Sequence, residues 1–185
     1  MPPSDTPPVT QIPVADEKAG PYGITAGPDG ALWLTLVHGG RIARLTLDGE
    51  LDEFPLDSPT CRPTVIAPGP DGALWFSRSQ DHQIGRITTD GETAAFPTPT
   101  PDSGPFGITA GPDGAMWFTQ MNTDRVGRIT TDGEITEFAL ITASGEITEY
   151  DLPSPSSEPH GITLGPDDAL WVALETGGVA RTAPW

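Results

Sequence analysis

A repeat of about 42 residues constrains the fold of this chain more than any other feature of its sequence. A segment of fourteen residues that ends in tryptophan occurs four times without gaps, at residues 20–33, 62–75, 104–117 and 158–171. The 185 residues include 22 glycines and 22 prolines, and those in these segments recur mostly at fixed positions, as turn residues do. The periodic placement argues against the disordered chain that such a composition would otherwise allow.

Each repeat is predicted to form four short strands. In the first repeat, strands are expected at residues 23–26, 31–35, 41–45 and 51–54, with Asp-Gly hairpin turns after the first and third of them. A unit of this length with four strands is typical of a β-propeller blade. The sequence therefore predicts an all-β propeller with four-stranded antiparallel blades near residues 20–56, 62–97, 104–140 and 158–182.

The two ends of the chain predict how the last blade is completed. The last repeat stops after its third strand, and the segment Val9-Thr10-Gln11-Ile12-Pro13 is similar to a missing fourth strand. We therefore expect residues 9–14 to close the last blade, so that residues 9–185 form one propeller domain and residues 1–8 a disordered tail.

The spacing of the repeats contains one anomaly. The repeat tryptophans Trp33, Trp75, Trp117 and Trp171 are 42, 42 and 54 residues apart. The extra twelve residues lie at 141–152, which nearly copy residues 129–140 and predict an additional hairpin. We interpret this hairpin as the junction left by an internal deletion, with tandem duplication of one hairpin as the alternative.

The charge balance excludes some classes of partner. Nine basic and 26 acidic residues give a net charge of −17, which would repel nucleic acids and anionic membranes. Cys61 is the single cysteine, so an intrachain disulfide and a cysteine metal site are excluded. The first residues have neither a basic region nor an apolar run, and we expect a cytoplasmic protein.

Comparison of equivalent positions singles out three residues of the last repeat. Glu158, His160 and Glu175 stand where the other repeats have Arg62 as their single ionisable residue. Residues 158 and 160 share a face of an extended segment, and Glu175 follows the neighbouring strand, so all three are expected at one mouth of the channel. Two carboxylates can hold a hard divalent cation, and a neutral histidine can act as a base. The alternative is a chance surface group that binds loop amides.

The recurring segments, among them Ile-Gly-Arg-Ile-Thr-Thr-Asp-Gly-Glu and Glu158-Pro159-His160-Gly161-Ile162, resemble the virginiamycin B lyase (streptogramin B lyase) family from about residue 9 onward. The resemblance implies a seven-bladed propeller that linearises type B streptogramins, which are cyclic depsipeptides, by elimination at their ester bond. The chain then lacks about three internal blades, and we expect an open or strained arrangement of about four that self-associates through its open faces.

The resemblance also implies roles for individual residues. Glu158 and Glu175 match the glutamates that hold Mg²⁺ in the family, and His160 matches its general base. The family's second functional histidine belongs to a blade that is absent here, and its equivalent positions hold Tyr22, Thr64 and Phe106. Of these, Tyr22 and Phe106 are expected to contact the substrate.

Two alternatives to an active lyase remain open, and we expect the lyase activity of this shortened chain to be weak or absent. The chain could be a degenerate, non-catalytic propeller that serves as a binding scaffold. It could instead be a metal-dependent sugar-lactone hydrolase, a function that would need more carboxylate or asparagine ligands than the other repeats supply.

Overall fold

The described residues form strands and no helices, and these strands form antiparallel sheets. The computed structural model describes residues 11–16, 18–139, 158–175 and 177–182. Sheet 1 consists of β1 (Pro21–Ala26), β2 (Leu32–Leu36), β3 (Arg41–Leu45) and β4 (Leu51–Pro55). Sheet 2 consists of β5 (Pro63–Pro68), β6 (Leu74–Arg78), β7 (Gln83–Ile87) and β8 (Thr93–Pro97). Sheet 3 consists of β9 (Pro105–Ala110), β10 (Met116–Gln120), β11 (Arg125–Ile129) and β12 (Ile135–Ala139). Sheet 4 has three described strands, β13 (Pro159–Leu164), β14 (Leu170–Leu174) and β15 (Gly178–Arg181).

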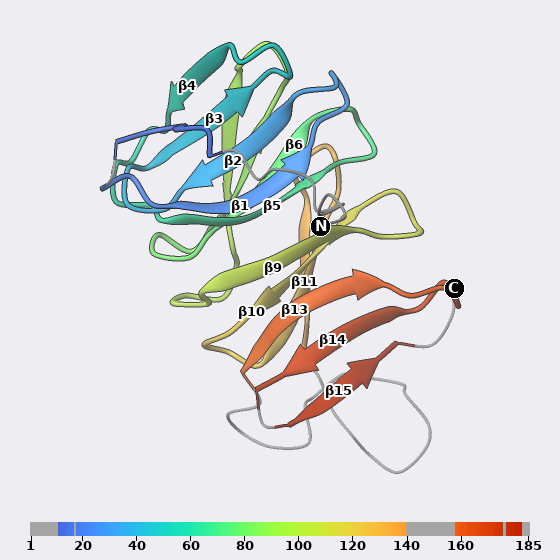
Figure 1. Cartoon of the computed structure of the whole chain (residues 1–185). Helices are drawn as coiled ribbons and strands as arrows, with labels where there is room; N and C mark the ends of the chain where they lie inside the picture. Colours follow the sequence, from blue (N-terminus) through green and yellow to red (C-terminus); the bar gives the residue numbers. More distant parts are fainter. Residues whose placement is uncertain (1–10, 17, 140–157, 176, 183–185) are drawn as a thin grey trace, which may run out of the picture.

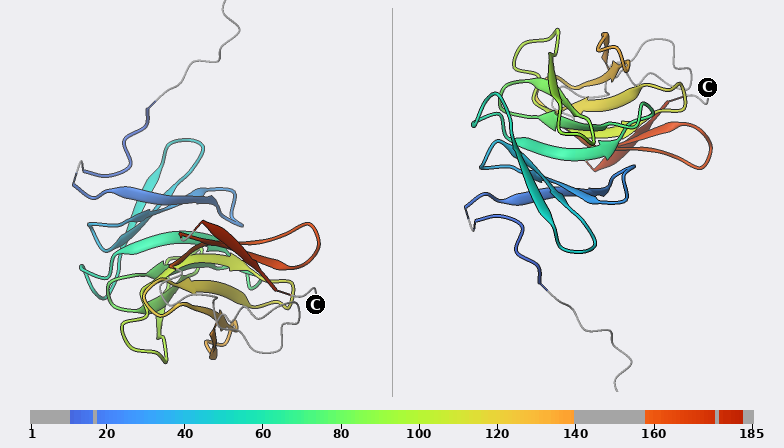
Figure 2. Two further views of the ribbon diagram at one scale, coloured as in Figure 1. Left: turned by 90° about the horizontal axis from the view of Figure 1, so that it is seen from below. Right: turned by 90° about the horizontal axis from the view of Figure 1, so that it is seen from above.

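The sheets follow one another in chain order, and each is an up-and-down meander. Their first strands β1, β5, β9 and β13 are successive neighbours, so they form the inner row of the molecule (Figure 1). Two further views show the same succession from sheet 1 in blue to sheet 4 in red (Figure 2). None of the described residues forms a helix that could cross a membrane. The arrangement confirms the all-β class with propeller-like sheets.

A bonded trio of side chains recurs in every sheet and ties the first hairpin to the third strand. The aspartate of the first turn accepts a hydrogen bond of 3.0 Å from the indole Nε1 of the tryptophan four residues later. Its second oxygen accepts a bond of 2.5–2.8 Å from an arginine Nε on the third strand. The trios are Asp29–Trp33–Arg44, Asp71–Trp75–Arg86, Asp113–Trp117–Arg128 and Asp167–Trp171–Arg181.

The trio explains why these aspartates remain charged. Burial raises the pKa of the Asp71 carboxyl, but hydrogen bonds from Trp75 and Arg86 outweigh it and hold the pKa below its usual range. At Asp167, the hydrogen bond from Trp171 and then that from Arg181 lower the pKa to about 2. The buried indole therefore has a charged acceptor, which is the stronger kind of hydrogen bond.

The apolar core lies between the sheets rather than within any one of them. Trp33 of sheet 1 belongs to one cluster with Ile66 and Phe76 of sheet 2. The same arrangement joins sheet 2 to sheet 3 and sheet 3 to sheet 4, through the clusters of Trp75 with Ile108 and of Trp117 with Val172. A single sheet cannot bury either of its faces, so each sheet depends on its neighbours for stability.

A hydroxyl on the second strand links each inner strand to the next one. Thr35 donates a hydrogen bond of 2.6 Å to the carbonyl of Thr64, and Ser77 donates to the carbonyl of Phe106. Thr119 donates a bond of 2.8 Å to the carbonyl of His160. These three bonds hold the starts of β1, β5, β9 and β13 in fixed positions relative to one another.

The prediction that residues 9–14 close the last sheet was wrong where the structure describes them. Residues 11–14 form no strand, and Val14 packs with Ala15 and Ala19 on Leu34, Leu36 and Leu45 of sheet 1. The reason is the location of the apolar surface: no other described sheet covers these leucines, so the segment packs on them. The predicted tail at 1–8, Val9, Thr10 and the hairpin at 141–152 lie outside the described residues.

We predict that Asp71→Asn destabilises the protein by about 1–2 kcal/mol, because the amide can still accept from Trp75 but loses its charged bond with Arg86. Asp90→Asn, at an exposed turn of the same sheet, serves as the control and should change little. Chemical denaturation of the three proteins at pH 7 measures the difference.

The same pair of variants tests the charge directly. A depressed pKa contributes stability that is present above the ordinary aspartate pKa and is lost as the pH falls through the folded-state value. The stability difference between the parent protein and Asp71→Asn should therefore narrow below about pH 4. A difference that stays constant from pH 7 to pH 2 would contradict the charged bond.

Candidate metal and catalytic site

The backbone of sheet 4 brings two glutamates side by side. Glu158 precedes β13 and Glu175 follows β14, and the Glu175 amide donates a hydrogen bond of 3.3 Å to the Glu158 carbonyl. The equivalent bond occurs in every sheet, where Val37, Ser79 and Met121 donate to Gly20, Arg62 and Gly104. The repeat itself therefore places the two side chains together, and only sheet 4 has carboxylates at both positions.

Glu158 has a left-handed backbone, with φ of 42°. Gly20 and Gly104 occupy the same position with φ of 64° and 59°, and Arg62 with φ of 52°. Glycine adopts this conformation without strain, whereas a residue with a side chain does so at a cost. The backbone of sheet 4 thus tolerates an unfavourable residue at the position where its carboxylate meets Glu175.

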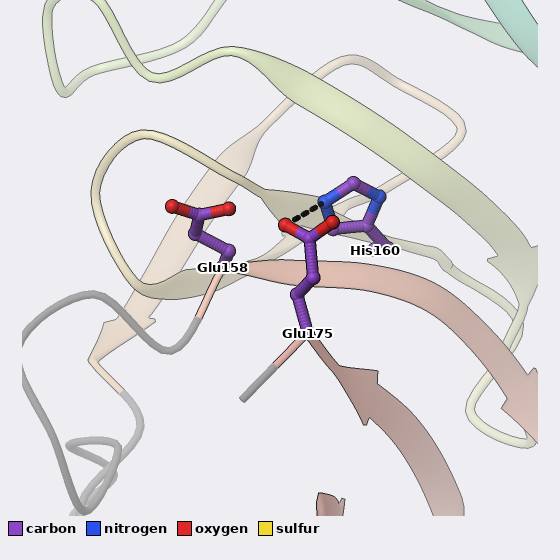
Figure 3. A group of neighbouring side chains, drawn as sticks. All are labelled: Glu158, His160 and Glu175. Carbon is purple, nitrogen blue, oxygen red and sulfur yellow. Dashed lines mark ion pairs between the residues drawn. The ribbon is translucent and has the colours of Figure 1, made fainter. Parts of the chain in front are cut away.

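The structure brings the three predicted site residues together. One ligand atom from each of Glu158, His160 and Glu175 lies within 4.8 Å of the others, the only such group among the described residues. His160 Nε2 is 3.5 Å from Glu175 Oε2 (Figure 3). His160 is half-buried and both glutamates are exposed, so the group is open to solvent on one side.

Mutual repulsion marks the two carboxylates as an anionic pair. A hydrogen bond with Glu175, and then its negative charge, raise the pKa of Glu158 above the usual range. A divalent cation would neutralise both groups, and carboxylate oxygens are ligands that suit Mg²⁺ or Mn²⁺. The two carboxylates therefore fit the predicted metal, and Glu158 and Glu175 are the residues that would hold it.

An aromatic row leads away from the site. The ring of Phe106 lies 5.2 Å from that of His160, tilted by 58°, and 6.2 Å from that of Tyr22 in an edge-to-face contact. All three start the inner strands of their sheets, which explains how residues so far apart in sequence meet. The predicted substrate contacts Tyr22 and Phe106 thus form one surface with His160.

Two supporting residues were missed by the sequence analysis. Thr119 fixes the backbone of His160 by its bond to the carbonyl, and the Glu158 amide donates to Asp124 Oδ1 at 3.2 Å. The Thr119 role has a signal in the sequence, because Thr35 and Ser77 fill the same position, but no role could be assigned without the contact. The Asp124 bond joins two loops from different sheets and has no such signal.

His82, His38 and Cys61 lie outside this group. His82 accepts a hydrogen bond from the Gly104 amide through Nδ1 at 3.2 Å. His38 is exposed. Cys61 is buried, and burial raises the pKa of its thiol to about 11, so it is not a reactive thiolate.

We predict that Glu158→Gly raises the thermal unfolding midpoint while it removes divalent-cation binding. Glycine relieves the left-handed backbone and ends the repulsion with Glu175, but it takes away one ligand. Arg62→Gly is the matched control, since it relieves the same conformation in sheet 2 and leaves the site intact. Calorimetric titration with Mg²⁺ and Mn²⁺ measures the binding, and equal binding by the parent and both variants would contradict the assignment.

Two solved structures that are more than 35% identical to this chain are streptogramin B lyases by their descriptions. A catalytically inactive histidine-to-alanine variant of virginiamycin B lyase from Staphylococcus aureus, crystallised with quinupristin, is 39% identical with a TM-score of 0.78. It is matched over 91% of this chain and 57% of its own. A streptogramin B lyase structure is 37% identical with a TM-score of 0.74, over 93% of this chain and 67% of its own.

Comparison of sequences leads to the same group. The virginiamycin B lyase of Saccharopolyspora erythraea is 64% identical over 45 residues, which are 24% of this chain and 15% of that protein. The chain spans 57% of the Staphylococcus aureus enzyme, so it is considerably shorter than that relative. The model of the virginiamycin B lyase family matches residues 7–143, which is well over half of the chain. The chain therefore belongs to the virginiamycin B lyase family.

Proposed function

We propose that this chain is a metal-dependent carbon–oxygen lyase that opens type B streptogramins, cyclic depsipeptides, at their ester bond. The single observation that carries the proposal is the group of Glu158, His160 and Glu175 within 4.8 Å. Family membership and the likeness to a lyase crystallised with quinupristin support it. The family match ends at residue 143, before these three residues, so their geometry supports the proposal independently.

His160 is the group that would move the proton. Its imidazole, when neutral, takes the proton from the α-carbon of the residue whose side-chain oxygen forms the ester. The electron pair left on that carbon forms a double bond to the β-carbon, and the β-carbon–oxygen bond breaks. The ring opens with one new carboxylate and one unsaturated residue, and no water is consumed.

The neighbours of His160 prepare it for this role. Glu175 lies 3.5 Å from Nε2, so a carboxylate stands beside the imidazolium that forms when the proton is taken. Thr119 and Phe106 hold the backbone and the ring of His160 from sheet 3. A divalent cation held by Glu158 and Glu175 would supply positive charge beside the substrate carbonyl and so acidify the α-proton.

The aromatic row offers a place for the rest of the substrate. Tyr22 is exposed and Phe106 is partly exposed, so both present ring surface on the same side as His160. Aromatic and apolar side chains of a depsipeptide ring could stack on such surfaces. We therefore propose Tyr22 and Phe106 as substrate contacts rather than proton donors.

A non-catalytic binding scaffold is the second candidate. The observation in its favour is that the positions equivalent to His160 supply no second histidine, because they hold Tyr22, Thr64 and Phe106. The described residues thus offer one histidine beside the carboxylates. A proton donor for the leaving carboxylate is not needed, because that group leaves as an anion, but slower turnover than in a complete ring is expected.

Ring opening of a type B streptogramin, followed by mass spectrometry with Mg²⁺ and with EDTA, tests the proposal. We expect a linear product of unchanged mass, since elimination adds no water, and no product with EDTA. His160→Ala should reduce turnover by about 100-fold or more, the usual contribution of a general base.

Glu92→Gln, at an exposed turn of sheet 2, is the control and should retain full turnover. A product heavier by one water would indicate hydrolysis and contradict the elimination. Folded protein that binds the antibiotic without any turnover would favour the scaffold instead.

A further inference from the structure

Sheets 1 and 4 each have one face that no other described sheet covers. We define the back face of a sheet as the side that carries its tryptophan, and the front face as the side that carries the isoleucine of its first strand. In the three internal contacts, the back face of one sheet packs on the front face of the next. Within the part of the chain that the structure describes, the front face of sheet 1 and the back face of sheet 4 have no such partner.

Equivalent residues show that both of these faces are built for contact. On front faces, Ile24 of sheet 1 is 61% exposed, whereas Ile66 and Ile108 are 5% and 4% exposed. On back faces, Val179 of sheet 4 is 66% exposed, whereas the equivalent residues Ile42, Ile84 and Val126 are at most 3% exposed. Trp171 is partly exposed, while the other three repeat tryptophans are buried.

The front face of sheet 1 already carries the connecting segment that an internal contact needs. Residues 14–19 are equivalent to residues 56–61, which run between sheets 1 and 2. Val14 and Ala19 pack on sheet 1 as Leu56 and Cys61 pack in the contact between those sheets. Ala19 also accepts a bond from the His38 amide, as Cys61 does from Gln80. The segment therefore belongs to the contact surface and does not block it.

We propose that a second copy of this chain covers both faces, with sheet 4 of each copy packed on sheet 1 of the other around a two-fold axis. The back face with Trp171 and Val179 meets the front face with Ile24, in the same way as the three contacts within the chain. Each copy thus forms half of a closed ring of eight sheets. Two-fold closure uses both faces of both copies and stops at two.

The curvature of the arc favours two copies over closure of one chain. The described sheets match about 57% of the Staphylococcus aureus enzyme, so a complete ring of that curvature would hold about six or seven sheets. Each sheet then turns through about 51–60°, whereas a ring of eight needs about 45° and a ring of four about 90°. Closure by two copies therefore requires a smaller change in the angle between neighbouring sheets than closure of one chain.

The second copy also completes the surroundings of the candidate site. His160 starts β13 beside Phe106 of the preceding inner strand. In the ring of eight, the next inner strand is β1 of the second copy, in which Tyr22 is the second residue. His160 would then lie between Phe106 of its own chain and Tyr22 of the second copy.

One feature makes the contact between copies weaker than the internal ones. Thr35, Ser77 and Thr119 donate hydrogen bonds to the next inner strand, but the equivalent residue of sheet 4 is Ala173. The contact with the second copy therefore lacks this bond, and association should depend on concentration. Ala173→Thr would restore the donor.

Sedimentation equilibrium of the full chain tests the proposal, and it does not depend on lyase activity. We expect a monomer–dimer equilibrium without larger species. Ile24→Asp and Val179→Asp should each raise the dissociation constant at least about tenfold, because each places a charge in an apolar contact that occurs twice per dimer. Ala173→Thr should lower it by about threefold or more. Leu47→Asp is the control, since Leu47 is 84% exposed at a turn outside both faces, and it should leave the constant unchanged.

A mixture of the two charged variants distinguishes the arrangement of the copies. Together, Ile24→Asp and Val179→Asp retain one intact contact per heterodimer, so the mixture should associate more tightly than either variant alone. A front-to-front or back-to-back dimer would be weakened by only one of the two substitutions, and would overturn the proposal. A parent chain that remains monomeric, or one that grows without limit, would overturn it as well. Both substituted side chains are already exposed, and circular dichroism checks that each variant keeps its β-sheet content.

Discussion

The packing of each tryptophan-bearing face on the isoleucine-bearing face of the next sheet is the interaction on which the rest of the structure depends. No sheet here has an apolar core of its own, because its large side chains lie on its two faces and belong to clusters shared with its neighbours. The aspartate–tryptophan–arginine trio keeps each indole oriented towards the next sheet. Stability is therefore cooperative along the chain, as in other repeat proteins.

The same packing positions the candidate site. His160 is held from sheet 3 by Thr119 and Phe106, and Glu158 is bonded to Asp124 in the loop between β10 and β11. The carboxylate pair thus belongs to sheet 4 but takes its position from sheet 3. A substitution that loosened the contact between these two sheets would move the base away from its support, even though the three site residues themselves share one sheet.

Much of the fold and the site could be predicted because repeats allow comparison within a single chain. The strands follow from the phase of Gly, Pro and Trp, and Glu158, His160 and Glu175 stood out as departures from equivalent positions. The N-terminal segment could not be predicted in the same way. Its sequence fits both a fourth strand and a cover for the leucines of sheet 1, and the choice depends on which surface is within reach. The left-handed backbone of Glu158 could not be read from the glutamate itself, and the glycines at the equivalent positions 20 and 104 were its single sign in the sequence.

The central claim is that an incomplete ring of this family keeps a metal site on its last sheet. Anomalous diffraction from crystals soaked in Mn²⁺, which takes the same oxygen ligands as Mg²⁺, tests it most directly. The predicted result is an anomalous peak between the carboxylates of Glu158 and Glu175, within about 2.5 Å of an oxygen of each. Peaks only at other acidic side chains, with none between these two glutamates, would contradict it.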